Sequence, residues 1–186
     1  MVGKSRDLSI IPDTINRSLL TSNLLRNAFL GAIRTGTTLS ESVKETAISR
    51  VAVLNKAWYE FEHHAPLALN PGGLPLEGLK CVLTSTPRQP QTVNKEIGID
   101  EQHAAVLEYT DHMTLDCEVP QEVFDRLKAV FSEREVVEIT ATVGAYNCVS
   151  RFLVALNVNE RNGEVGMREA LKHVHPELEK LTPAKR

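Results

Sequence analysis

The chain has 186 residues with a formal net charge of −3, and 42% of the residues are hydrophobic. This length and apolar content fit a single domain with a substantial core. The slightly acidic balance argues against a nucleic-acid or anionic-membrane partner, because both bind basic surfaces, and we see no apolar run near the roughly 20 residues of a membrane span. Cys81, Cys117 and Cys148 are widely spaced, and no secretory signal is recognisable, so we expect a cytoplasmic protein.

Helical periodicity covers most of the sequence, and no segment has a convincing strand pattern. Helices are predicted, in chain order, over residues 15–33, 39–54, 55–66, 75–82, 100–115, 121–131 and 132–156. The segment 84–99 contains two prolines and no apolar period, so it is predicted to be a loop. It could act as a lid over a pocket or be a simple insertion, and we favour the insertion.

Local signals mark several helix ends. Ser40 and Asp100 are predicted N-caps, and Asn55 is expected to interrupt one helix and cap the next. Ser132 followed three residues later by Glu135 is a capping box. These signals predict an all-α fold.

The ends of the chain differ from its middle. Residues 1–14 are interpreted as an N-terminal arm, and residues 15–158 as the helical domain. Residues 159–186 are charged and are predicted to form a tail, with a loose helix near residues 165–174 and an extended end.

The stretch from residue 55 to residue 66 holds the only Trp and two of the six histidines. In a helix Glu60 and His64 share a face, so they could form a proton-transfer pair with the carboxylate fixing the imidazole tautomer. Trp58 and Phe61 could form an apolar wall that desolvates this pair. The alternative is an ordinary surface pair of little energetic value.

Glu45 on the preceding helix, followed by the run Tyr59-Glu60-Phe61-x-x-His64, resembles the carboxymuconolactone decarboxylase family, which includes the AhpD-like alkyl hydroperoxidases. The redox branch carries a Cys-x-x-Cys motif whose two positions here are Ala57 and Glu60. The run is therefore similar to the non-redox branch, whose motif is Tyr-Glu-Trp-x-x-His. The resemblance covers roughly residues 15–158, and it continues at 107–111, 132–135, 146–147 and 151–153.

The resemblance implies an AhpD-like all-α domain that assembles as a homotrimer or homohexamer, with its pocket near a subunit contact. It also implies a cofactor-free lyase that decarboxylates a small carboxylated cyclic metabolite, such as a lactone or an aromatic or polyketide-like acid. We assign His64 as the proton donor or acceptor, Glu60 as the group that orients it, and Glu45 as a further acid–base group or a buried structural acid.

A second set of side chains is predicted to contact the substrate: Trp58, Tyr59, Phe61, Tyr146, Asn147 and Arg151. The aromatic residues of the set could instead be core or subunit-contact residues. Tyr146 and Asn147 could be hydrogen-bonded core groups, and Arg151 could form a surface ion pair rather than bind a carboxylate. His63 is about 100° away from His64 around a helix, so we expect it at the surface or an interface.

We expect no bound metal and no cofactor. Glu60 and His63 match the Glu-x-x-His spacing of di-iron bundles, and Glu108 and His112 lie four apart, but only one copy of the required motif is present. The sequence has no Gly-rich phosphate loop and no nucleotide fingerprint.

Other functions remain open on the same scaffold. An isomerase, dehydratase or cyclase would use the same acid–base groups, and a non-catalytic relative could bind a metabolite or act as a scaffold. Thiol-dependent peroxide reduction is disfavoured by the missing Cys-x-x-Cys. An enzyme should bury Glu60 and His64 at a closed cavity, whereas a scaffold should leave them solvated.

Overall fold

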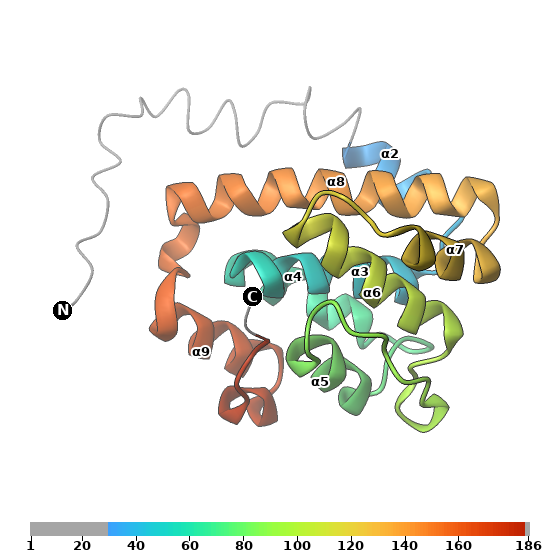
Figure 1. Ribbon diagram of the computed structural model, residues 1–186. Helices are drawn as coiled ribbons and strands as arrows, with labels where there is room; N and C mark the ends of the chain where they lie inside the picture. The colour runs from blue at the N-terminus through green and yellow to red at the C-terminus, as the bar shows by residue number, and fades with distance from the viewer. Residues whose placement is uncertain (1–29, 185–186) are drawn as a thin grey trace.

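The computed structural model describes residues 30–184, which form eight α-helices and no β-strand (Figure 1). The helices are α2 (Leu30–Thr35), α3 (Glu41–Asn55), α4 (Trp58–Ala68), α5 (Leu76–Thr84), α6 (Glu101–Leu115), α7 (Gln121–Val130), α8 (Glu133–Leu156) and α9 (Gly163–Val174). Short 3₁₀ turns lie at Lys95–Ile97, Val158–Glu160 and Pro176–Lys180. The all-α prediction is confirmed. The predicted arm at 1–14 and most of the helix at 15–33 lie outside the described residues.

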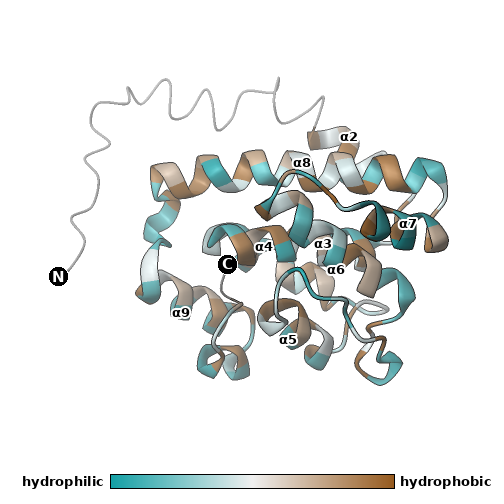
Figure 2. Cartoon of the chain, in the orientation of Figure 1, coloured by the Kyte–Doolittle hydropathy of each residue, from teal (hydrophilic) through white to brown (hydrophobic). Residues whose placement is uncertain are grey.

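Helix α3 is the centre of the fold and packs against α4, α6 and α8 (Figure 1). Every residue from Val43 to Asn55 is buried, the polar ones included. A helix that is covered on all sides needs no single apolar stripe, and Figure 2 shows polar and apolar residues mixed along the central helices. Glu45 and Arg50 find partners on the helices around α3, whereas the hydroxyls of Thr46 and Ser49 have no hydrogen-bond partner among the described residues.

The start of α3 follows its sequence signal, but the junction with α4 differs from the prediction. Ser40 caps α3 as expected, and α3 ends at Asn55, with Lys56 in the left-handed conformation (φ 57°). Asn55 does not cap α4, because the cap position is Ala57, which offers no side-chain acceptor. The amide of Asn55 instead donates to the Asn147 side chain on α8.

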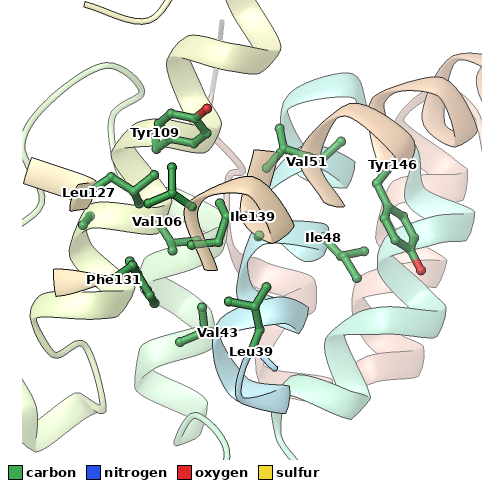
Figure 3. Packing of buried hydrophobic residues seen from close by; sticks show 14 of the residues in the cluster. Leu39, Val43, Ile48, Val51, Val106, Tyr109, Leu127, Phe131, Ile139 and Tyr146 are labelled. Carbon is green, nitrogen blue, oxygen red and sulfur yellow. The ribbon is translucent and has the colours of Figure 1, made fainter. Parts of the chain in front are cut away.

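Two hydrophobic clusters make up the core. The first joins α3 to α6, α7 and α8, and Figure 3 shows its residues meeting between these helices. The second joins α3 and α4 to α5 and α9. Fully buried side chains of the two clusters include Ile48, Val51, Val106, Leu127 and Ile139 in the first, and Phe61, Leu79, Leu83 and Leu171 in the second. Helix α3 thus contributes to both clusters and fixes where α4 and α8 lie.

The segment after α8 is helical where expected, but it is not loose. Helix α9 packs on α4, and Ala170, Leu171 and Leu178 are fully buried in the second cluster. The backbone N–H of Ala184 also donates to the carbonyl of Leu83 on α5. The segment is rich in charged residues, so its narrow apolar face, which packs on α4, is not evident from composition alone.

Helices α6 and α8 begin where their caps predict. The Asp100 side chain accepts the His103 backbone N–H, and Ser132 with Glu135 forms the complete capping box. Pro120 occupies the N-cap position of α7. These local signals depend only on neighbouring residues, so they survive in any tertiary context.

Replacing Ser132 by Ala is expected to lower the free energy of unfolding by about 1 kcal/mol, because the α8 capping box loses its acceptor for a backbone N–H. Urea unfolding measures this loss. Ser132→Thr keeps a hydroxyl at the cap and should retain most of the stability. An equal loss in both variants would contradict a capping role.

Helix α8 corrects one expectation about apolar runs. Among the described residues it is the one helix that is long and apolar enough to cross a membrane by length and composition. The sequence of α8 shows no unbroken apolar run, because its Thr, Gly and Tyr residues separate the aliphatic side chains. A core helix meets the same requirement, and α8 packs against α3 and α6.

The loop before α6 is tied to that helix by Arg88. Its guanidinium makes a bidentate contact with Asp116, and its backbone N–H donates to Asp111. A short 3₁₀ turn and one isolated bridge between Asn94 and Ile99 complete the segment. These contacts hold the loop along α6.

Candidate active site

The centre of the candidate site is a hydrogen bond between α3 and α4. His64 Nδ1 lies 2.7 Å from Glu45 Oε2, and the two residues are 9% and 3% exposed. A carboxylate can only accept, so Nδ1 carries a proton and Nε2 is the nitrogen left for chemistry. His64 Nε2 makes no hydrogen bond to any residue between 30 and 184. Glu45 therefore fixes the orientation of the imidazole.

The predicted pairing of Glu60 with His64 is wrong. Glu60 lies four residues before His64 on α4, yet its Oε1 accepts a hydrogen bond of 2.8 Å from Ser150 Oγ on α8. Helical spacing puts both residues on one side of α4, but this side of α4 meets two helices, α3 and α8. The imidazole bonds to the first of these helices and the carboxyl to the second. The orienting role assigned to Glu60 belongs to Glu45.

Glu60 is in an unusual environment for a carboxyl group. It is 2% exposed, and its Oε2 has no hydrogen-bond partner among the described residues. Burial raises the pKa of Glu60 well above its ordinary value of 4.5, and the hydrogen bond from Ser150 offsets only part of that rise. Glu60 is thus suited to hold a proton beside the Glu45–His64 pair.

This raised pKa predicts a pH effect on stability. Because the folded state binds the Glu60 proton more tightly than the unfolded state, stability is fully present below pH 4.5 and falls as pH rises through the folded pKa. Glu60→Gln keeps an oxygen for Ser150 and removes the titration. We expect the variant to gain stability relative to the wild type as pH rises.

Urea unfolding of both proteins at a series of pH values above 4.5 measures that difference. Every other titrating group is shared, so the difference between the two curves isolates Glu60. A difference that stays constant with pH would contradict a raised pKa.

Tyr146 and Arg34 complete the centre of the site. The Tyr146 ring lies edge-on to the His64 ring, with centroids 4.9 Å apart, and its hydroxyl accepts a hydrogen bond of 3.1 Å from Arg34 Nε. Burial raises the pKa of Tyr146, the Arg34 contact lowers it, and the nearby charges of Glu45 and Glu60 raise it further. A cation and a neutral phenol therefore stand beside the acid–base groups.

The predicted aromatic wall is part of the core. Trp58 and Phe61 are buried, contact each other edge to face at 6.1 Å, and belong to the second hydrophobic cluster. Tyr59 is half-buried and stacks on His63, which is exposed as expected. Among the described residues, His64 hydrogen-bonds to Glu45 and packs on Tyr146, and none of these four makes such a contact with it.

Asn147 and Arg151 form a separate polar network on α8. The Asn147 side chain accepts from Asn55 and from Arg151, and it donates to Thr114. Its hydrogen-bonding capacity is used within the protein, which favours the core interpretation for Asn147. Arg151 is exposed and bonds within its own helix turn rather than to an acidic side chain.

The residues considered for a di-iron site do not come together. Glu60 is buried against Ser150 while His63 is exposed, and Glu108 makes a bidentate ion pair with Arg126. Within residues 30–184 no group of three or more metal-ligating side chains is arranged to hold an ion.

Comparison with known proteins identifies the fold. No protein-family model and no curated protein matches the sequence. The structure is similar, with a TM-score of 0.57, to a crystal structure of a protein of unknown function from Agrobacterium tumefaciens, proposed to be the antioxidant defence protein AhpD. The two are 23% identical, and the match covers 70% of this chain and 84% of the other. The chain therefore has an AhpD-like fold.

Proposed function

We propose that this protein is a cofactor-free lyase that decarboxylates a small, carboxylated cyclic metabolite, with His64 as the proton-transfer group. The buried hydrogen bond between Glu45 and His64 is the observation that carries the proposal. A carboxylate–imidazole pair shielded from water can hold and deliver a proton near neutral pH. The resemblance of the Glu45 and Glu60-to-His64 motifs to the non-redox decarboxylases supports the same chemistry.

The proposed reaction has two steps. The substrate carboxylate leaves as carbon dioxide, and its bonding electrons pass into the ring carbonyl to give an enolate. Arg34 and the Tyr146 hydroxyl that it contacts are proposed to stabilise the charge on the enolate oxygen, since the Tyr146 ring packs edge-on to the His64 ring. His64, protonated on both nitrogens, then donates its Nε2 proton to the carbon that lost the carboxylate. Glu45 stabilises the imidazolium before this transfer.

Glu60 is proposed to assist as a neutral acid. Its buried carboxyl group keeps its proton more readily than an exposed one and avoids placing a second negative charge beside the enolate. Within this scheme Glu45 and Glu60 have different tasks because their surroundings differ: the first contacts an imidazole and the second a serine hydroxyl.

The same groups would serve an isomerase, dehydratase or cyclase if the substrate had no carboxylate to lose. A thiol peroxidase is disfavoured, although the structural neighbour is proposed to act in antioxidant defence. The two cysteine positions of the redox motif hold Ala57 and Glu60 in this chain. We further propose that the protein works as a homotrimer or homohexamer, as the resemblance implies.

Mass spectrometry of reaction mixtures tests the proposal. Carboxylated lactones, and separately a metabolite extract, are incubated with the wild type and with His64→Gln. Loss of carbon dioxide from one compound only with the wild type supports the lyase. A change of structure at constant mass supports the isomerase or cyclase alternative. Equal conversion by both proteins would show that His64 is not catalytic, and no conversion by either contradicts the proposal and favours a binding role.

A further inference from the structure

A second group of reactive side chains lies where the N-terminal ends of α3 and α6 meet. A pocket of about 440 Å³ opens there, next to the turn that follows α4. Its walls come from three segments: Ser40, Glu41 and Ser42; Leu67, Asn70, Pro71, Gly72 and Gly73; and Gly98, Asp100, Gln102 and His103. None of the groups of the Glu45–His64 site lines this pocket.

Three of these residues form a continuous hydrogen-bonded chain. Ser42 Oγ lies 2.8 Å from His103 Nε2, and His103 Nδ1 lies 2.7 Å from Asp100 Oδ1. A carboxylate only accepts, so Nδ1 donates to Asp100. In the neutral ring Nε2 is then the acceptor for the Ser42 hydroxyl. This tautomer is the one in which an imidazole can act as a base toward a serine.

The surroundings support each member of the chain. His103 is 7% exposed, and Asp100 accepts both its ring and its backbone N–H. Burial raises the pKa of Asp100, but these hydrogen bonds lower it more, so the carboxyl stays ionised. Ser42 is half-buried and lines the pocket, which gives its hydroxyl access to a bound molecule.

We propose that Ser42, His103 and Asp100 form a second catalytic site, a serine-hydrolase triad that cleaves small uncharged carboxylic esters. Ser42 stands in the first turn of α3, where backbone N–H groups have no carbonyl partner within the helix. Ser40 accepts from the N–H groups of Val43 and Lys44, which leaves those of Glu41 and Ser42 and the positive end of the helix beside the nucleophile, where a carbonyl oxygen gains negative charge during attack.

The lining of the pocket indicates the substrate class. Its volume suits a small molecule, and Leu67 and Pro71 provide apolar surface for an alkyl or aryl group. Glu41 and Asp100 bring carboxylates to the same pocket and disfavour an anionic acyl or alcohol group. Neutral esters of short acids fit this combination best.

The reaction proceeds by acyl transfer to Ser42. Ser42 Oγ attacks the ester carbonyl carbon as His103 Nε2 takes the hydroxyl proton. The tetrahedral intermediate expels the alcohol oxygen, which receives that proton, and an acyl-serine remains. Water, deprotonated by His103, attacks the acyl carbon and releases the carboxylic acid as the proton returns to Ser42.

Covalent labelling with a fluorophosphonate tests the proposal, because phosphonylation requires a nucleophilic serine. A serine in a purely structural hydrogen-bond network would not be labelled. Labelling is located by peptide mass analysis, and p-nitrophenyl acetate hydrolysis is followed in parallel. We expect one phosphonyl group on Ser42 and none in Ser42→Ala. His103→Gln should slow labelling and hydrolysis by at least about 10²-fold.

Two variants guard against loss of structure. Asp100→Asn keeps an N-cap for α6 but removes the charge, so it should fold normally and lose kcat with little change in KM. Ser49→Ala removes a buried serine from the same helix and should react like the wild type. Absence of label on the folded wild type, a label on Ser40 instead, or full activity in His103→Gln or Asp100→Asn would overturn the proposal.

Discussion

Replacing His64 by Gln is expected to lower kcat/KM by about 10²- to 10⁴-fold on the substrate that the wild type converts. Gln is similar in size and can still hydrogen-bond to Glu45, but it cannot transfer a proton as an imidazole does. Steady-state kinetics on the purified variants measures the loss. The matched control is His63→Gln, whose exposed ring hydrogen-bonds to the Tyr59 carbonyl and packs on the Tyr59 ring. Its rate should equal that of the wild type.

The two glutamates should rank in a definite order. Glu45→Gln weakens the partner of His64 directly, so it should reduce kcat more than Glu60→Gln, which leaves the imidazole contact intact. The reverse order would restore the pairing that helical spacing alone suggests. A His64→Gln variant as active as His63→Gln would remove His64 from the chemistry altogether.

Removing Asp111 is expected to have the largest effect on stability. Arg50 is fully buried and donates to both Asp111 oxygens, at 2.6 and 3.0 Å, as well as to the carbonyls of Val82 and Ser85. Asp111→Ala leaves a guanidinium without its counter-charge in the interior. The free energy of unfolding should fall by about 3–5 kcal/mol.

The matched control for that loss is a surface pair on the same helix end. Asp116 makes a bidentate contact with Arg88. The Arg88 side chain is 39% exposed and that of Asp116 is 33% exposed. Asp116→Ala should cost much less than Asp111→Ala, because water screens this pair. Urea unfolding of both variants gives the comparison, and equal losses would show that burial of the Arg50–Asp111 pair has no special value.

Helix positions were readable from the sequence because their signals are local. Ser40, Asp100 and Ser132 each satisfy a backbone N–H within their own first turn, and this contact forms wherever the helix packs. The apolar face of α9 was underrated for a tertiary reason. Its few apolar residues, such as Leu171, matter only because α4 supplies a surface for them.

The members of the candidate site were predicted better than their contacts. Glu45, Glu60, His64 and Tyr146 do lie near one another, but helical spacing could not tell which carboxyl group meets the imidazole. That choice depends on how α3 and α8 cross α4. Arg34 was missed because a basic residue in the last turn of a helix ordinarily serves the helix dipole, and no motif marks it.

The second site was hidden by the same limitation. Asp100 and His103 were visible as the start of a helix, and the capping role of Asp100 explained its presence. Ser42 lies 61 residues away from His103 in the chain and reaches it only because α3 and α6 pack together. The spacing of residues in the sequence does not indicate that α3 and α6 pack together.

Hydrogen exchange into the decarboxylated product tests the proton-transfer role of His64 most directly. If His64 delivers a proton to carbon, it must also remove that proton from the product, so the wild type in D₂O should place deuterium at that one carbon. The His63→Gln variant should do the same, while His64→Gln should exchange no faster than buffer. Exchange at the wild-type rate in His64→Gln, or no exchange by a wild type that turns over its substrate, would contradict the account.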